Sequence, residues 1–354
     1  MKALVLGATG HIGAHVVRAL LADGHQVRAA YRHDCYLHVL EGLPVERVRV
    51  DLESLEGLPE ALRSCLWVFH AAGAYPGPRE RHDEAVARAV HTTRRVLDAF
   101  RQAAPERVVF TSSASTIRRV PGRLATEQDA EPWSPHLSSA HGTDMPPSAK
   151  RQVGGRPLYA TVKIAMEREV LRVAGEGIPV VIVNPSVCIG EYDAHRFSGR
   201  AVLFLAKARL PFYIEYMLNA VYTGDVGVGH VRAAERGRLG ERYLLAGHNV
   251  ALKDFASMVA HAIGAPPPRW RVPYGLALAV SAASELIARV AGTEPMLPRS
   301  AVQASRQGLG LDATKAKTEL GLPQTPLEEA IARSIAWFKA HGYLESGRGL
   351  LDPR

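Results

Sequence analysis

The sequence predicts an α/β fold: a doubly wound parallel sheet with helices on both faces, followed by a smaller, mainly helical part. Three observations support this prediction. Short aliphatic runs alternate with helical stretches through the first half of the chain, which is the order of a parallel sheet. The run 180–183 reads Val-Val-Ile-Val, and unbroken apolar runs are typical of strands buried on both faces. After residue 184 the helical stretches become longer and the strands fewer.

The first strand is expected at 3–6, where an apolar run ends in glycine. A helix is expected at 13–22, because its valines and leucines recur on one side at helical spacing. The remaining strands of this half are expected at 26–31, 45–50, 67–70, 108–111 and 180–183. Further helices are expected at 58–64, 81–104, 159–174, 255–263, 276–290 and 327–341.

This pattern divides the chain into two expected parts. Residues 1–184 form a dinucleotide-binding domain, and residues 185–354 form mainly a substrate-binding lobe that is interleaved with late strands of the same sheet. Residues 117–157 are rich in Pro, Ser, Gly and charge and show little periodicity. A loop of this length inside a compact domain is usually functional or mobile.

The composition excludes several classes of protein. The chain has 354 residues, and Lys plus Arg exceed Asp plus Glu by 43 − 35 = 8. The basic residues are scattered, so we expect small anionic ligands rather than nucleic acid. Three cysteines without short spacing give neither a disulfide framework nor a zinc motif. The sequence shows no signal peptide, and its apolar stretch at 275–283 is too short to span a bilayer. We therefore expect a cytoplasmic protein.

A glycine-rich loop follows the first strand and opens the first helix. Gly7, Gly10 and Gly13 have the spacing of the dinucleotide-binding fingerprint of Rossmann folds. Gly7 would allow the tight turn, Gly10 the close approach of a pyrophosphate, and Gly13 close helix packing. The helix N-terminus would then favour the phosphates.

The end of the second strand bears on the choice of cofactor. An acidic residue there binds the ribose diol of NAD, whereas this chain reads Ala30-Tyr31-Arg32. A guanidinium at that position could bind a 2′-phosphate through two hydrogen bonds. NADP is therefore favoured, and the nearby Asp34 leaves NAD open.

Tyr159 and Lys163 stand four residues apart on an expected helix, so both side chains share one face. A neighbouring ammonium group lowers the pKa of a phenol, and Tyr159 could then give or take a proton while hydride passes to or from a nicotinamide. The strand at 108–111 is followed by Ser112 and Ser113 at the carboxyl edge of the sheet. A serine there can donate a hydrogen bond to the substrate oxygen.

Together these motifs resemble the extended branch of the short-chain dehydrogenase/reductase superfamily. The resemblance runs in order over nearly the whole chain and is greatest to bacterial proteins like dihydroflavonol reductase or the hopanoid-associated sugar epimerase. It rests on Gly7-x-x-Gly10-x-x-Gly13, Asp51-Leu52, His70-Ala71-Ala72-Gly73, Thr111-Ser112-Ser113-Ala114, Tyr159-x-x-x-Lys163 and Asn184-Pro185-Ser186.

The resemblance implies a role for each matching residue. Ser113 would polarise the carbonyl, Tyr159 would be the acid or base, and Lys163 would bind the nicotinamide ribose. The Asp51 carboxylate would accept from the adenine amino group, with the N–H of Leu52 nearby. The other residues implied in cofactor binding are Thr9, His11, Ile12, Arg32, Ala71, Ala72, Gly73, Thr111, Pro185 and Ser186, beside the three glycines. No metal site is expected, because His70 and His91 have no ligand partners at suitable spacing.

Two departures from the family pattern stand out. The family often has Asn-Val-x-Gly-Thr before the serine strand, where this chain reads Ala89-Val90-His91-Thr92-Thr93. The usual support of the lysine is therefore in question. Ser113 and Tyr159 are also 159 − 113 = 46 residues apart, which enlarges the loop expected over the substrate.

Three functions are compatible with these residues. The favoured one is an NAD(P)H-dependent oxidoreductase acting on the carbonyl or alcohol of a small, apolar or aromatic metabolite. The second is a nucleotide-sugar epimerase or dehydratase with tightly bound NAD, which needs a basic pocket for a diphosphate. The third is a dinucleotide-sensing protein without catalysis. The basic candidates are Arg196, Arg200, Lys207, Arg209 and Arg232, and the apolar ones are Phe197, Leu203, Phe204, Phe212, Tyr213, Tyr216 and Met217.

The region expected to read the substrate comprises residues 117–157, 195–219 and 273–299. The identity of the substrate and the direction of the reaction do not follow from the sequence. Relatives often form homodimers through the helix that carries the tyrosine, so a homodimer is compatible with the resemblance.

Overall fold

A computed structural model describes residues 1–73, 76, 80–130, 158–196, 199–291, 302 and 310–344 of the chain. Its main feature is a seven-stranded sheet with the order β10-β6-β5-β4-β1-β2-β3. Every neighbouring pair in this sheet is parallel. The strands are β1 (Lys2–Leu6), β2 (Gln26–Tyr31), β3 (Glu46–Arg49), β4 (Trp67–His70), β5 (Arg107–Thr111), β6 (Val180–Pro185) and β10 (Arg242–Leu245).

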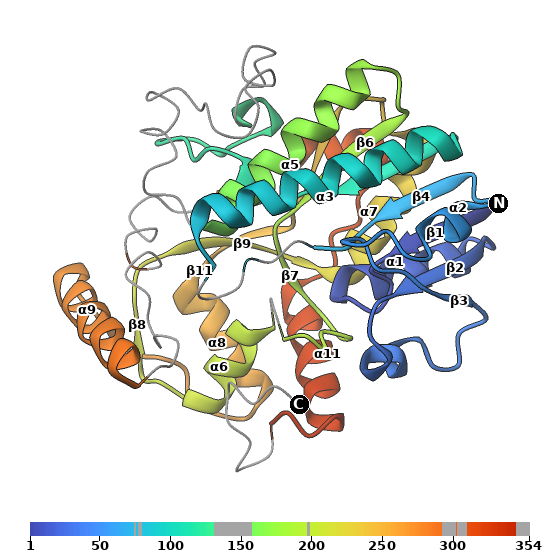
Figure 1. The fold of residues 1–354 in the computed structure, drawn as a ribbon. Coiled ribbons are helices and arrows are strands. Elements are labelled where there is room, and N and C mark those ends of the chain that lie inside the picture. The colour runs from blue at the N-terminus through green and yellow to red at the C-terminus, as the bar shows by residue number, and fades with distance from the viewer. Residues whose placement is uncertain are drawn as a thin grey trace.

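Helices cover both faces of the sheet, as Figure 1 shows. On one face α1 (His11–Ala22) packs against α7 (Thr223–Arg236), and both contribute to one hydrophobic core with the sheet. On the other face α3 (His82–Ala103) packs against α5 (Leu158–Gly175), and the short α2 (Leu58–Leu62) joins their core. The predicted doubly wound α/β fold is confirmed.

Strand β1 shows why the inner strands of this sheet are largely apolar. Ala3 and Val5 belong to the core on the α1 side, while Leu4 and Leu6 belong to the core on the α3 side. All four side chains are buried, because successive residues of a strand point to opposite faces.

The second half contains a smaller sheet with the order β11-β9-β7 and several helices. Its strands are β7 (Val187–Ile189), β9 (Met217–Tyr222) and β11 (His248–Ala251), and β8 (Phe212–Tyr213) pairs separately with β12 (Trp270–Arg271). Its helices are α6 (Arg200–Ala208), α8 (Leu252–Ala262), α9 (Tyr274–Ala291) and α11 (Leu327–Ala340). Shorter turns are η1 (Asp34–Leu40), η2 (Ala114–Thr116), η3 (Glu127–Asp129) and the π-helical η5 (Ala316–Leu320).

The expected elements of the first half agree with the observed ones to within about two residues at each end. The second half differs, because the sequence pattern did not indicate the strands β7, β8, β9, β11 and β12, and it gave no bounds for the late strands expected in the main sheet. Strand β10 comes from this half and still pairs with β6 of the main sheet. Of the long expected loop, residues 131–157 lie outside the described residues. Its described start forms a bridge between Ile117 and Ala130.

Candidate active site

The glycine-rich loop lies between β1 and α1 and has no room for larger residues. Gly7 has a φ of 79°, and a Cβ there would lie 2.8 Å from the Cα of Ala72. A Cβ on Gly13 would lie 2.0 Å from the carbonyl oxygen of Gly7. The two glycines therefore allow the loop to pack against β4 and against the first turn of α1.

The start of α1 can accept an anion. Gly10 is the N-cap and supplies no side-chain cap, and the first turn has no acidic residue. The first helical hydrogen bond runs from the N–H of Ala14 to the carbonyl of Gly10, so the N–H groups of residues 11–13 lie before it. Such a turn suits the phosphates of a dinucleotide, and the loop fits that cofactor.

Two predicted cofactor residues of this loop have buried side chains. Thr9 is buried, and the imidazole Nε2 of His11 lies 2.9 Å from the hydroxyl of Thr223 on α7. Burial lowers the pKa of His11, although Asp193 opposes the shift. His11 is thus held by the second half of the chain, and it can offer a cofactor only its backbone.

Asp51 follows β3 and forms a tight turn. Its Oδ1 accepts hydrogen bonds from the N–H groups of Glu53 at 2.7 Å and Ser54 at 3.0 Å. These bonds hold the pKa of Asp51 below its usual value, and the charge of Arg32 adds to the effect. Because both bonds use Oδ1, Oδ2 can accept from an adenine amino group. Arg32 is exposed, and its Nε lies 2.8 Å from Nε2 of His33.

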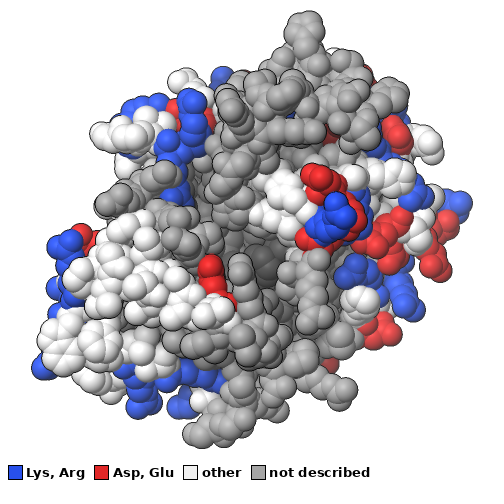
Figure 2. Space-filling view, turned by 60° about the vertical axis from the view of Figure 1, so that its left-hand side comes forward, with Lys and Arg blue, Asp and Glu red and all other residues white. Residues whose placement is uncertain are grey.

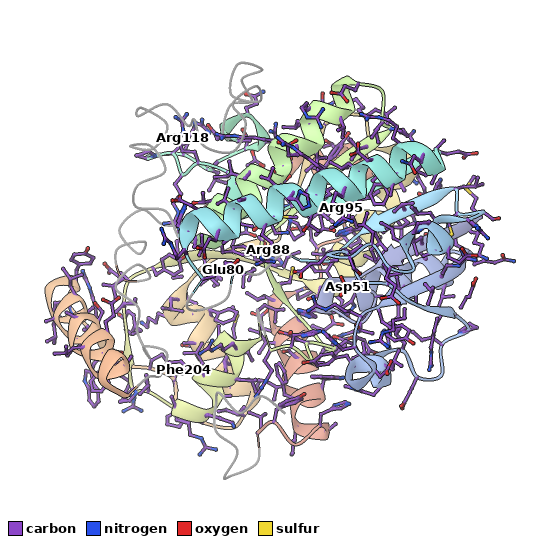
Figure 3. The ribbon with its side chains drawn as sticks, viewed as in Figure 1. Asp51, Glu80, Arg88, Arg95, Arg118 and Phe204 are labelled. Carbon is purple, nitrogen blue, oxygen red and sulfur yellow. The ribbon has the colours of Figure 1, made fainter. Side chains whose placement is uncertain are left out.

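Helix α3 supports this turn through two arginines that sequence reasoning missed (Figure 3). Arg95 donates to the carbonyl of Glu53 at 2.7 Å. Arg88 donates to the carboxylate of Glu53 at 3.1 Å and binds Glu80 through two bonds of 2.9 Å. The sequence gave no signal for these contacts, because charged residues are common on exposed helices and the partners, Glu53 and Glu80, lie in loops before α3.

The three predicted catalytic residues lie together at the end of β5. The phenol of Tyr159 hydrogen-bonds with the side chain of Ser113. Ser113 also accepts from the N–H of Ser115 at 3.1 Å. The buried ammonium of Lys163 donates to the carbonyl oxygen of Thr111 at 3.2 Å. The hydroxyl of Ser112 instead donates to the buried carboxylate of Glu167, so of the two serines it is Ser113 that lies beside Tyr159.

The electrostatics differ from the expectation for Tyr159. Burial raises the pKa of its phenol, and the hydrogen bond with Ser113 only partly opposes this rise. Burial also lowers the pKa of Lys163 to about 8, with the charge of Glu167 opposing. The prediction that Lys163 lowers the pKa of Tyr159 is not met here, because its ammonium group is directed at Thr111. Near pH 7 the phenol therefore holds its proton.

Buried hydrogen bonds through His230 hold Thr111, whose carbonyl accepts the hydrogen bond from Lys163. The imidazole Nδ1 of His230 lies 2.7 Å from the carbonyl of Val226, so it carries the proton and donates. Nε2 then accepts from the hydroxyl of Thr111 at 2.9 Å. This arrangement on α7 supports the lysine site in a chain that lacks the usual asparagine on α3.

Glu167 forms a buried polar cluster behind Ser113. Its carboxylate accepts from Ser112, from Thr116 at 3.1 Å and from the amide of Asn184 at 2.9 Å, and it pairs with Arg242. The amide of Asn184 also donates to the carbonyl of Ser113 at 3.2 Å. Glu167 follows Lys163 by one helical turn, which was the only sequence signal for it. The cluster joins α5, β5, β6 and β10 beneath the reacting groups.

The remaining predicted residues lie around the same edge of the sheet. The N–H of Ala71 donates to the carbonyl of Leu6 at 3.0 Å, which places the segment after β4 beside the glycine-rich loop. Pro185 is buried at the end of β6, and the N–H of Ser186 donates to the carbonyl of Leu245. His70 packs between the rings of Phe100 and Phe110, and burial lowers its pKa to about 4.

The residues expected to read the substrate separate into different environments. Leu203 is buried in a core cluster, whereas Phe212 and Met217 are exposed. Phe204 is half-buried on α6 (Figure 3), and Phe197 lies outside the described residues. Among the basic candidates, Arg232 lies on α7 and pairs with Glu235 at 2.7 Å and Asp23 at 3.6 Å. Arg232 therefore belongs to the layer that covers the main sheet.

Comparison with known proteins agrees with this arrangement. Residues 3–246 match the model of the NAD dependent epimerase/dehydratase family. The chain belongs to this family. Its members are NAD(P)-dependent reductases and epimerases, and the predicted family resemblance is confirmed.

Two curated relatives and one solved structure match almost the full length of the chain. A protein named "Putative dihydroflavonol 4-reductase" from Synechocystis is 32% identical, over 97% of this chain and 96% of its own. "Sterol demethylase protein B" from Methylococcus capsulatus is 29% identical, over 97% and 100%. The structure of a nucleoside-diphosphate-sugar epimerase from Pseudomonas aeruginosa has a TM-score of 0.75 and 28% identity, over 98% and 99%.

Proposed function

We propose that this chain is an NAD(P)H-dependent reductase of a ketone or aldehyde group in a small, apolar or aromatic metabolite. The observation that carries the proposal is the contact between Ser113 and a Tyr159 phenol whose pKa is raised by burial. Reduction of a carbonyl needs a group that gives a proton to the oxygen. A phenol that keeps its proton at neutral pH has the required state.

Each residue then has a distinct task. The reduced dinucleotide, when bound, supplies the hydride. Ser113 donates a hydrogen bond to the substrate oxygen, and Tyr159 gives its proton to that oxygen as negative charge develops there. Lys163 holds a positive charge beneath the site and binds the ribose, while the start of α1 binds the pyrophosphate.

NADP is the proposed preference, because Arg32 follows β2 where an NAD-binding protein has an acidic residue. Titrations of the apo-protein with NADPH and NADH test this preference. Arg32→Ala should weaken NADPH binding at least about tenfold, as expected for a lost charged hydrogen-bonding group, and leave NADH binding nearly unchanged. Arg63→Ala, at another exposed arginine, is the matched control and should change neither affinity. Equal losses for both cofactors would contradict the assignment of Arg32.

The alternative is an epimerase or dehydratase acting on a nucleotide sugar. The likeness to the Pseudomonas aeruginosa epimerase over nearly the whole chain favours it. An enzyme of this kind regenerates its cofactor, so purified protein should release tightly held NAD on denaturation. An empty protein that oxidises NADPH with carbonyl compounds, and loses this activity in Tyr159→Phe, supports the reductase. Released NAD and no NADPH oxidation would overturn it.

A further inference from the structure

Helix α9 has an unusual distribution of side chains. Among the side chains of α9 that the structure describes, the buried ones are small: Ala277, Ser281 and Ala288. Its exposed residues are Gly275 and Ala282 together with a set of apolar residues at helical spacing, namely Leu276, Ala279, Val280, Ala283 and Leu286. Leu276 is 57% exposed and Leu286 is 64% exposed. A surface helix usually buries its larger apolar residues and exposes polar ones, whereas the described side chains of α9 leave two leucines and a valine exposed.

The exposed apolar surface continues into the strands that precede α9. Trp270 on β12 is 59% exposed, and its ring lies 5.6 Å from that of Phe212 on β8. Leu210 is also exposed beside a shallow hollow that Leu205, Phe212 and Ile263 help to line. Figure 1 shows α9 and β8 together at one end of the molecule, away from the main sheet. We call this surface, made of β8, β12 and the exposed side of α9, the α9 surface.

Basic residues border the α9 surface. The segments 205–213 and 265–284 contain Lys207, Arg209, Arg269 and Arg271, and α9 itself carries one acidic residue, the half-buried Glu285. Arg209, Arg269 and Arg271 are exposed, and Arg271 is 2.9 Å from Glu215. Figure 2 brings this side forward and shows a broad area of uncharged side chains with Lys and Arg below it and at its outer edge.

We propose that the α9 surface binds the anionic surface of a lipid bilayer. Exposed leucines, an exposed tryptophan and flanking arginines are the combination that lies in the headgroup region of membranes, with the cations at the phosphates. The protein would lie on the bilayer rather than cross it, since no helix among the described residues is long and apolar enough to span a membrane. The basic border favours an anionic surface over a second copy, because a second copy carries the same formal net charge of +8.

The test is flotation of the full-length protein with lipid vesicles. The protein should float with vesicles of phosphatidylcholine and phosphatidylglycerol, and less with phosphatidylcholine alone. Leu276→Glu/Leu286→Glu should reduce binding at least about tenfold, because two leucines no longer enter the apolar region. Arg269→Gln/Arg271→Gln should reduce binding only to the anionic vesicles, and high salt should remove that difference.

The matched control is Leu66→Glu/Leu239→Glu, which makes the same chemical change at leucines that are 40% and 54% exposed in the first domain and next to β10. It should float like the unaltered protein. Thermal unfolding of each variant shows that the changes do not unfold the chain. Two outcomes would overturn the proposal: equal binding by both double-leucine variants, or no flotation of the unaltered protein. If the unaltered protein does not float but sediments as a dimer, and Leu276→Glu/Leu286→Glu converts this dimer to a monomer, the α9 surface is an interface with a second copy.

Discussion

The Glu167 cluster gives a prediction whose size follows from the structure. Glu167→Gln removes a charge that is 4% exposed, while its partner Arg242 is 20% exposed. Breaking a fully buried ion pair costs about 3–5 kcal/mol, and partial exposure of the arginine reduces this cost. A glutamine also offers a single acceptor oxygen to the donors from Ser112, Thr116 and Asn184. We therefore expect a loss of about 2–3 kcal/mol in the free energy of unfolding.

Urea unfolding measures this loss, as a lower midpoint with an unchanged slope. The control is Glu169→Gln on the same helix. Glu169 is also buried, but its partners Arg94 and Arg172 are 44% and 30% exposed. Because water reaches these two arginines more than it reaches Arg242, their pairs with Glu169 are screened more strongly, and this variant should lose less. The reasoning is refuted if the Glu167 variant loses less than the Glu169 variant.

Three further predictions concern single residues. The pKa of Lys163 is about 8 in the folded protein against its ordinary 10.5, so the folded state loses stability as pH falls from 10.5 to 8. Lys163→Met should therefore raise the free energy of unfolding at pH 7 by up to about 3 kcal/mol. Equal stability of both proteins in urea at pH 7 would contradict this. Gly13→Ala should prevent correct folding, because its Cβ would meet the Gly7 carbonyl, and soluble expression should be lost. The control is Gly24→Ala, whose Cβ meets nothing within 4 Å and which should lower the free energy of unfolding by only about 1 kcal/mol. Burial raises the pKa of the Cys188 thiol to about 12, so this thiol should resist iodoacetamide at pH 8 until urea unfolds the chain. Alkylated Cys188 in mass spectra of the native protein would contradict this.

Most of the main sheet was predictable because its inner strands are buried on both faces and are therefore largely apolar, whereas the edge strand β3 is mostly exposed and reads Glu-Arg-Val-Arg. The short strands of the second half were not. The strand at His248–Ala251 contains a histidine and an asparagine, and β8 and β12 have two residues each. Their extended conformation depends on pairing with distant segments rather than on local composition.

The candidate site divides in the same way. Spacing on one helix and the end of one strand predicted that Ser113, Tyr159 and Lys163 would lie together. The supports of this site come from residues far along the chain: Arg242 is 75 residues from Glu167, and His230 is 119 residues from Thr111. No local pattern specifies such partners. The direction of the pKa shift of Tyr159 was also beyond the sequence, because it depends on burial rather than on spacing.

Strand β10 has a consequence for synthesis of the protein. It covers the edge of β6, yet it begins 242 − 185 = 57 residues after β6 ends. At about 5–20 residues per second, a ribosome needs about 3–11 s to add them. During that interval the backbone N–H and C=O groups along one side of a strand that begins Val-Val-Ile-Val lack their partner. Nascent chains are therefore most prone to join one another at this edge, and slower growth at low temperature with ample chaperone should raise the yield of folded protein.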